Sequence, residues 1–241
     1  DAHSQPYPDY IANCIKALEE DRGENVGGVW EIRPGANTWI AKSIAVAAAH
    51  PLGVGDALYR HTKIAAEVDT VPFGSFKRTL IESVGFFDES LLTNEDYEFN
   101  ARVRKAGGRI WLDPAIRSVY YARSTLLELA QQYWRYGFWK WRMLRRYPTT
   151  LRWRQALPPL FVLSLVSLSI FSIFILIARI ALMSELVLYF SIMTLAGIFA
   201  AHRQKKIFLI LGLPLTIPFM HITWGGGFLW SMLTSSKQKN G

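Results

Sequence analysis

The sequence predicts an α/β domain followed by a bundle of about three membrane-spanning helices. Residues 157–178 contain no charged side chain, and about 20 apolar residues in a helix cross the roughly 30 Å of bilayer hydrocarbon. Further apolar segments follow at 180–201 and 207–233. The residues before them are polar, mixed in charge, and alternate between strand and helix patterns, which is typical of an α/β layer.

The polar half opens with a helix, a strand and a second helix. In residues 8–20 apolar side chains recur at helical spacing, and Asp9 stands where an N-cap is expected. Residues 26–32 predict a short strand, and residues 38–49 predict a helix that ends before a His-Pro pair. Two glycines then predict a loop at 53–55.

Strand and helix patterns continue through the rest of the polar half. Residues 68–73 predict a strand and residues 79–84 a short helix that ends at a glycine. Residues 94–106 predict a helix with acids in its first turn, bases in its last turn and two glycines after it. That charge order complements the helix dipole, and glycine closes helices. A further strand is predicted at 109–112.

Residues 125–147 predict a long helix in which Trp134, Phe138 and Trp141 form one stripe among basic side chains. Aromatic and basic side chains favour the headgroup layer of a membrane, so we expect an interfacial helix. The alternative is a helix packed on the soluble domain, and the two are compatible. The expected organisation is a polar α/β domain at 1–123, an interfacial helix and linker at 124–154, a transmembrane region at 155–234 and a tail at 235–241.

The third apolar segment is interrupted by Pro214, Pro218 and three consecutive glycines at 225–227. It either spans the membrane or forms a re-entrant hairpin, which such residues permit. We expect it to span.

Basic side chains cluster at two places, although the net charge of the whole chain is only +8. Seven lie at 135–154, before the first apolar segment, and three at 203–206, between the second and third. By the positive-inside rule this predicts a multi-pass protein of the inner cell membrane with its polar α/β domain in the cytoplasm. Acidic membrane lipid accounts for the basic excess, and nucleic acid is not expected because no binding motif accompanies the charge. The single cysteine, Cys14, excludes an internal disulfide and suits a reducing cytoplasm.

Two groups of polar side chains, each containing a carboxylate, are the first candidates for chemistry. In a strand-like stretch Asp1 and His3 would point to one side and approach one divalent ion, magnesium or manganese; the alternative is an ordinary loop. Asp96, at the start of a predicted helix beside Glu95, is a candidate general base. The alternative is a capping box formed by Thr93 and Asp96.

A third candidate group, Gln132 and Arg135 followed by Tyr136, lies on adjacent turns of the long helix. Such side chains hold a phosphate or a sugar by hydrogen bonds. The alternative is the ordinary polar face of an amphipathic helix.

Together, these groups and the apolar segments after them resemble the family 2 processive-type glycosyltransferases. Finer stretches resemble the succinoglycan-biosynthesis type of this family. They are residues 51–55, 68–78, 84–89, 94–100 and 135–137, together with His221, Gly225 and Gly227.

The resemblance implies an A-type, Rossmann-like glycosyltransferase fold of which this chain carries the C-terminal half. It also implies a role for each matching residue: Asp1 and His3 for the metal (Mn²⁺ or Mg²⁺) and diphosphate, Asp96 as the catalytic base with Glu95 as its neighbour, and Gln132, Arg135, Tyr136 and Asp69 for donor or acceptor binding. His3 stands where a second Asp is commoner in the family, which leaves the metal open. Tyr136 stands where Trp is commoner, so transfer of one sugar is expected rather than polymerisation.

The implied function is that of an inverting glycosyltransferase, which passes a sugar from a nucleotide-sugar donor to a lipid-linked saccharide in polysaccharide biosynthesis. Because the other half of the nucleotide-binding sheet would precede Asp1, this chain alone is expected to be inactive and to bind no nucleotide sugar. The alternative is a noncatalytic membrane scaffold or transporter component, favoured by Glu185 and His221 within apolar segments. His221 could instead only hydrogen-bond a neighbouring helix.

Overall fold

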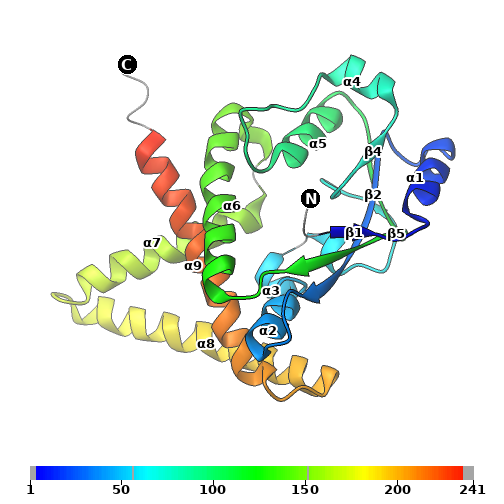
Figure 1. Ribbon diagram of the computed structural model, residues 1–241. Coiled ribbons are helices and arrows are strands. Elements are labelled where there is room, and N and C mark those ends of the chain that lie inside the picture. Colours follow the sequence, from blue (N-terminus) through cyan, green and yellow to red (C-terminus); the bar gives the residue numbers. More distant parts are fainter. Residues whose placement is uncertain (1–3, 56, 151, 236–241) are drawn as a thin grey trace. The chain divides into compact units, whose positions relative to one another are not determined.

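The computed structural model describes residues 4–55, 57–150 and 152–235, and these divide into two compact units (Figure 1). Of the described residues, the first unit contains 4–33, 48–55, 57–122 and 143–150. The second unit contains 34–47, 123–142 and 152–235. The predicted Asp1 and His3 lie outside the described residues.

The first unit is organised around a five-stranded sheet in the order β1-β5-β2-β4, with β3 also paired to β5. β1 and β3 run antiparallel to β5, and β4 runs antiparallel to β2. The combination of this sheet with helices confirms the predicted α/β class. The strands are β1 (Ser4–Pro6), β2 (Asn25–Pro34), β3 (Ala66–Glu67), β4 (Ser75–Phe76) and β5 (Ile110–Ala122).

Helix α1 (Tyr10–Glu19) packs on the sheet through Tyr10 and Cys14 of its predicted apolar stripe, whereas Ile11 and Ile15 of that stripe are exposed. Cys14 is buried in a cluster with Val26 of β2 and Ile116 of β5. Burial raises the pKa of the Cys14 thiol, which keeps it protonated and unreactive. Asp9 occupies the N-cap position, but its carboxylate makes no capping hydrogen bond.

Helix α5 (Glu95–Lys105) buries a second cluster against another part of the sheet. Phe99 and Val103, one turn apart, contact Ile110 and Leu112 of β5. The rest of this unit is connected by short helices: α3 (Pro51–Val54), α4 (Arg78–Val84) and single 3₁₀ turns at Leu58–Arg60 and Pro148–Thr150.

The prediction of a strand at 68–73 is wrong. Only its first residue joins the sheet, through a hydrogen bond from the Val68 N–H to the Ile110 carbonyl at 2.9 Å. Pro72 has no N–H to donate, and Phe73 has a φ of 49°, which is outside the strand region. The segment therefore runs as an irregular connection between β3 and β4.

The strand predicted at 109–112 is real but much longer, because β5 continues to Ala122. From the local sequence, an end of the strand before Pro114 is reasonable, because proline has no N–H to donate to a neighbouring strand. Asp113 compensates locally: its carboxylate accepts a hydrogen bond from the Ala115 N–H at 2.8 Å. The strand continues without a break and forms the centre of the sheet with β2.

The loop predicted at 53–55 is also partly wrong, because α3 extends to Val54. The His50 ring nitrogen Nδ1 accepts a hydrogen bond from the Leu52 N–H at 3.2 Å and so caps this helix. Proline in the first turn suits a helix start. Gly55, with a φ of 64°, ends the helix.

The second unit consists of helices gathered around α9, which contacts α2, α7 and α8 (Figure 1). α2 contributes Ser43, whose side chain lies where a Cβ on Gly212 of α9 would be. α7, α8 and α9 are each long and apolar enough to cross a membrane. The helices are α2 (Trp39–Ala47), α6 (Leu126–Arg146), of which residues 143–146 belong to the first unit, α7 (Trp153–Phe171), α8 (Leu176–Gln204) and α9 (Leu209–Ser235).

The third apolar segment forms one continuous helix, α9, with Pro214 and Pro218 inside it. At about 1.5 Å per residue its 27 residues exceed the thickness of bilayer hydrocarbon. Its length and continuity favour spanning over a re-entrant hairpin.

The three glycines of α9 allow two other helices to approach its backbone. A Cβ on Gly225 would collide with the Pro158 carbonyl of α7, and a Cβ on Gly227 would collide with the Trp134 carbonyl of α6. A Cβ on Gly226 would meet only the Trp134 ring, at 3.2 Å. Small residues serve this purpose wherever membrane helices pack closely.

We expect Gly227→Ala to destabilise the second unit by about 1–3 kcal/mol, because its methyl group would push against a backbone carbonyl that cannot rotate away. Gly226→Ala is the matched control, since the Trp134 ring can shift and alanine is the better helix former. Thermal unfolding in detergent should show a lower midpoint for the first variant only. Equal midpoints would contradict close packing at Gly227.

If α7, α8 and α9 cross the membrane, the protein should resist extraction from it. The protein should stay in the membrane pellet after washing with alkaline carbonate or concentrated salt, because apolar helices resist both treatments while surface charge attraction is screened by salt. A peripheral membrane protein released by the same wash is the control. Recovery of the protein in the supernatant would contradict integration.

Candidate functional site

The first candidate site lies at the start of α5. Asn94 is the N-cap residue, with a φ of 71° in the left-handed region, and Glu95 and Asp96 form the first turn. Both acidic side chains are exposed. The Asp96 carboxylate accepts a hydrogen bond from the Tyr97 N–H at 2.7 Å. The helix N-terminus thus holds a negative charge that solvent can reach.

The capping box considered for Thr93 and Asp96 does not form. A box requires Thr93 at the N-cap position, but the helix begins one residue later, after Asn94. The Thr93 hydroxyl donates instead to the Leu92 carbonyl, at 2.7 Å. The structure therefore gives Asp96 no capping-box role.

Asp69 lies behind this turn and is buried. Its carboxylate accepts a hydrogen bond from the Tyr97 hydroxyl at 3.0 Å. Tyr97 is therefore held between two carboxylates, with its N–H on Asp96 and its hydroxyl on Asp69. Through this hydrogen bond Asp69 holds the side chain of Tyr97 in place at the start of α5. A role of Asp69 in donor or acceptor binding stays a prediction.

A buried hydrogen-bonded chain, missed in the sequence, fixes the middle of α5. The Asn25 side chain donates to the Asn100 carbonyl oxygen Oδ1 at 2.6 Å, and Asn100 donates in turn to the Thr70 hydroxyl at 2.9 Å. All three residues are buried. A buried amide side chain stabilises one arrangement of the core only when it is hydrogen-bonded. Asn100 meets this condition, because its oxygen accepts from Asn25 and its nitrogen donates to Thr70.

A buried ion pair fixes the connection that leads to α5. The Glu98 side chain is fully buried, and Arg102 contacts its two carboxylate oxygens at 2.6 and 2.9 Å. Arg102 also donates to the carbonyls of Val84, Gly85 and Phe86. One guanidinium therefore ties the end of α4 to α5.

The second predicted group lies on α6, in the second unit. The Gln132 side chain donates a hydrogen bond to the Tyr136 hydroxyl at 2.9 Å, one helical turn away. Arg135 is exposed. With spacings of three and four residues, the three side chains lie on one side of the helix. The structure thus groups Asp69, Glu95 and Asp96 around Tyr97, and separately groups Gln132, Arg135 and Tyr136.

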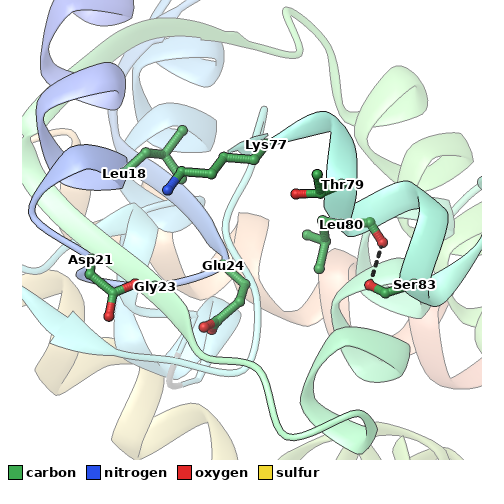
Figure 2. A pocket seen from close by; sticks show the side chains of 8 residues that line it. All are labelled: Leu18, Asp21, Gly23, Glu24, Lys77, Thr79, Leu80 and Ser83. Carbon is green, nitrogen blue, oxygen red and sulfur yellow. Dashed lines mark hydrogen bonds between the residues drawn. The ribbon is translucent and has the colours of Figure 1, made fainter.

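A small cavity of the first unit is lined by none of the predicted site residues that the structure describes (Figure 2). Its volume is about 250 Å³. Figure 2 shows Asp21 and Glu24 on one side and residues of α4 on the other. Arg109 pairs with the Asp21 carboxylate at 3.2 Å and donates its N–H to Glu24. The lining residues are Leu18, Asp21, Gly23, Glu24, Lys77, Thr79, Leu80 and Ser83.

Two ionisable residues of the apolar helices, Glu185 and His221, form hydrogen bonds to a neighbouring helix. The Tyr189 hydroxyl of α8 hydrogen-bonds the His221 ring nitrogen Nδ1 of α9 at 2.9 Å. The Ser164 hydroxyl of α7 donates to the Glu185 carboxylate of α8 at 2.6 Å. His221 thus bonds a neighbouring helix, which is the simpler of the two interpretations drawn from the sequence.

The comparisons with known proteins identify the class: the chain is a homologue of family 2 glycosyltransferases, which confirms the resemblance seen in its motifs. No family model matches it. One relative is the dolichyl N-acetyl-alpha-D-glucosaminyl phosphate 3-beta-D-2,3-diacetamido-2,3-dideoxy-beta-D-glucuronosyltransferase of Methanococcus voltae, 31% identical over 186 residues. That match covers 74% of this chain and 57% of the relative.

A second relative is the succinoglycan biosynthesis protein ExoA of Rhizobium meliloti (strain 1021), 29% identical over 137 residues. This match covers 57% of the chain and 41% of the relative. The chain thus spans about half the length of the curated relatives it matches.

Proposed function

We propose that the protein is an inverting glycosyltransferase that moves a sugar from a nucleotide-sugar donor to a lipid-linked saccharide in polysaccharide or glycolipid biosynthesis. Its first unit would be the C-terminal half of an A-type, Rossmann-like catalytic domain. The observation that carries the proposal is the exposed carboxylate of Asp96 at the start of α5 in a homologue of this enzyme class. Membrane-length helices support an acceptor that is itself held in a membrane.

In the proposed reaction, Asp96 takes the proton of an acceptor hydroxyl. The acceptor oxygen then bonds to the anomeric carbon of the donor sugar, while the bond from that carbon to the diphosphate oxygen breaks. Attack opposite the leaving group inverts the anomeric configuration. Tyr97 orients the base through its N–H, and Asp69 holds Tyr97 in place.

Arg135 is proposed to stabilise the negative charge that develops on the departing nucleoside diphosphate. Its exposed side chain and its position one turn from Gln132 suit a phosphate, because arginine donates several hydrogen bonds at once. Tyr136 replaces the commoner Trp of the family motif and accepts a hydrogen bond from Gln132. We propose transfer of a single sugar on this ground.

A divalent cation, manganese or magnesium, is proposed to bind Asp1 and His3. A carboxylate with an imidazole suits either ion, and a donor diphosphate would supply further oxygens. Within the described residues, no group of three His, Cys, Asp or Glu side chains is placed to hold a metal ion. When bound, the cation neutralises charge on the diphosphate.

The orientation of the protein is proposed from its basic residues. The clusters before α7 and between α8 and α9 would lie on the cytoplasmic face of the inner membrane, where nucleotide sugars are available. The first unit would then work on the inner leaflet, against a lipid-linked acceptor.

Because this chain alone is expected to be inactive, the test is a transfer assay on membranes from cells that express the full-length protein, with a panel of labelled nucleotide sugars and a lipid-linked saccharide extract. We expect one donor to give a lipid-soluble labelled product and an equal amount of nucleoside diphosphate. Nuclear magnetic resonance of the product should show the opposite anomeric configuration to the donor. A retained configuration would exclude the inverting mechanism, and membranes without transfer from any donor would contradict the function.

Metal dependence provides a separate expected result. A chelator should abolish transfer, and manganese or magnesium should restore it, while His3→Ala should change which of the two ions works better. The control is His202→Ala, which removes an exposed histidine near the end of α8. Full turnover in the presence of chelator would rule out the proposed cation.

A further inference from the structure

Helix α2 comes from the polar half of the sequence, yet it belongs to the second unit together with the three membrane-length helices. It packs on α9, as Figure 1 shows. The buried Ser43 side chain lies where a Cβ on Gly212 of α9 would be, so the two helices approach closely at this point. The Ser43 hydroxyl is satisfied within α2, because it donates to the Trp39 carbonyl at 2.7 Å. α2 is therefore a packed part of the second unit.

The contact with α2 lies at one end of the membrane-length helices. α9 begins at Leu209, so Gly212 belongs to its first turn. The last part of α8 packs on the same region, because a Cβ on Gly197 would collide with the Leu209 carbonyl. At about 1.5 Å per residue, α8 and α9 are both longer than the roughly 30 Å of bilayer hydrocarbon. When they span a membrane, their joined ends lie in the headgroup layer, and α2 lies at the same depth.

Large apolar side chains are exposed close to this contact in the sequence. Trp39, the first residue of α2, is 47% exposed, and Leu211, next to Gly212, is 72% exposed. Ile207, between α8 and α9, is 82% exposed. Exposure of such a set to water costs free energy, whereas the edge of a bilayer accommodates it. The indole ring in particular favours the boundary between headgroups and acyl chains, because it has an apolar body and a polar N–H.

Basic side chains accompany these apolar ones. Three of them lie in the 202–208 turn, defined here as the end of α8 with the connection to α9, and one lies on α2. Among the described residues, none of these four side chains forms an ion pair. The four residues are Lys42, Arg203, Lys205 and Lys206. Their charges are therefore available to a partner.

Acidic side chains do not offset this charge. Residues 34–47 and 193–216 contain no Asp or Glu. In the described part of the second unit the acidic residues are Glu128 and Glu185. Glu128 accepts hydrogen bonds from N–H groups just before its own helix, and Glu185 lies several turns away from the 202–208 turn along α8. The local charge therefore favours an anionic partner.

We propose that α2 and the 202–208 turn lie in the headgroup layer of an anionic lipid membrane. Trp39 would lie at the boundary with the acyl chains, and the four basic side chains would lie at the lipid phosphates. With nine residues, α2 is too short to cross a bilayer, so it would lie along the surface. The proposal rests on the contacts and charges of the second unit and does not depend on the proposed sugar transfer.

The depth of α2 can be measured with spin labels on the full-length protein in liposomes that contain anionic lipid. Its reactive cysteines are replaced by serine, while Cys14 can remain because it is buried. One label is placed at Trp39→Cys and another, as a reference for the acyl-chain region, at Leu188→Cys on the exposed side of α8. Lipids that are spin-labelled at the headgroup calibrate the accessibility to oxygen and to a water-soluble nickel chelate.

We expect the label at Trp39→Cys to be less accessible to nickel than the headgroup label and less accessible to oxygen than the label at Leu188→Cys. Nickel accessibility above that of the headgroup label would place α2 in water and would overturn the proposal. Low accessibility to both reagents would show that protein rather than lipid covers this position, which would overturn it as well.

A photocrosslinker tests the charge of the lipid. Benzophenone attached at Trp39→Cys should react with phospholipid on illumination, in liposomes that mix anionic and zwitterionic lipid, and mass spectrometry counts the two kinds of adduct. We expect anionic adducts to be enriched over the bulk lipid by about fivefold or more, since one basic side chain near an anionic surface supplies about that factor. Adducts in the bulk ratio would contradict the preference for anionic lipid.

Charge variants show whether the 202–208 turn causes the enrichment. Combined Arg203→Gln and Lys206→Gln changes should bring the ratio of adducts close to that of the bulk lipid. Combined Lys63→Gln and Lys105→Gln changes are the matched control, because they remove two exposed lysines of the first unit and should leave the enrichment unchanged. An equal effect of both pairs would show that net charge alone is responsible and would overturn the assignment to α2 and the turn.

Discussion

Asp96→Asn is expected to lower the rate of sugar transfer by about 10²–10⁴-fold, the usual loss when a general base is removed. The amide cannot take a proton from the acceptor hydroxyl. It can still accept the Tyr97 N–H through its oxygen, so the first turn of α5 should keep its geometry. The measurement is kcat in membranes, together with the KM for the donor, which should stay close to that of the unchanged protein.

Glu82→Gln is the matched control for this variant, because it removes an exposed carboxylate of α4 with the same change in charge. It should keep full activity. If Asp96→Asn also keeps its activity but unfolds at a lower temperature, the carboxylate serves the helix dipole, an effect of about 0.3–1 kcal/mol. That result would contradict the catalytic assignment.

Arg102→Met is expected to destabilise the first unit by about 3–5 kcal/mol, because it leaves the fully buried Glu98 carboxylate without its ion-pair partner. The carbonyls of Val84, Gly85 and Phe86 would lose a donor as well. Chemical denaturation in detergent, followed by protease sensitivity of the 85–94 loop, measures both consequences.

A double variant shows whether the buried charge causes this loss. Removing both partners with Glu98→Met and Arg102→Met should restore much of the stability, because no charge is then left unpaired in the interior. Lys16→Met changes an exposed lysine in a surface pair with Glu20 and should cost less than about 1 kcal/mol. A cost of that size for Arg102→Met alone would show that water reaches Glu98.

Helices α1 and α5 could be predicted from the sequence because their signals are local, whereas the apolar segment predicted at 157–178 is divided where α7 ends at Phe171 and α8 begins at Leu176. α1 and α5 differ from the predicted ranges by one or two residues, since apolar spacing and end charges act within a few turns. The strands depend on partners distant in the sequence. β5 continues through Pro114 because β1, β2 and β3 pair with it, which the local pattern does not show. Residues 68–73 have strand composition but contain the turn at Phe73.

The candidate site was predictable in part for the same reason. The position of Asp96 at a helix start follows from local sequence, and the structure places it there. The contact of Asp69 with Tyr97 and the chain from Asn25 to Asn100 and Thr70 join segments far apart in sequence. Polar residues such as Asn100 could be singled out only as unusual within a helix interior, because their partners are set by tertiary structure.

The central position of α9 has a consequence for how the protein is made. Its partners α2, α6, α7 and α8 all precede it in the chain, yet each packs against it. During synthesis they leave the ribosome before the helix that will cover them. Until α9 is made, the earlier helices expose the surfaces that later contact its glycines. Partly assembled membrane domains of this kind are prone to misassembly. Cells that lack a membrane-insertion chaperone should therefore accumulate degraded protein, with cleavage beginning before α9 has been inserted.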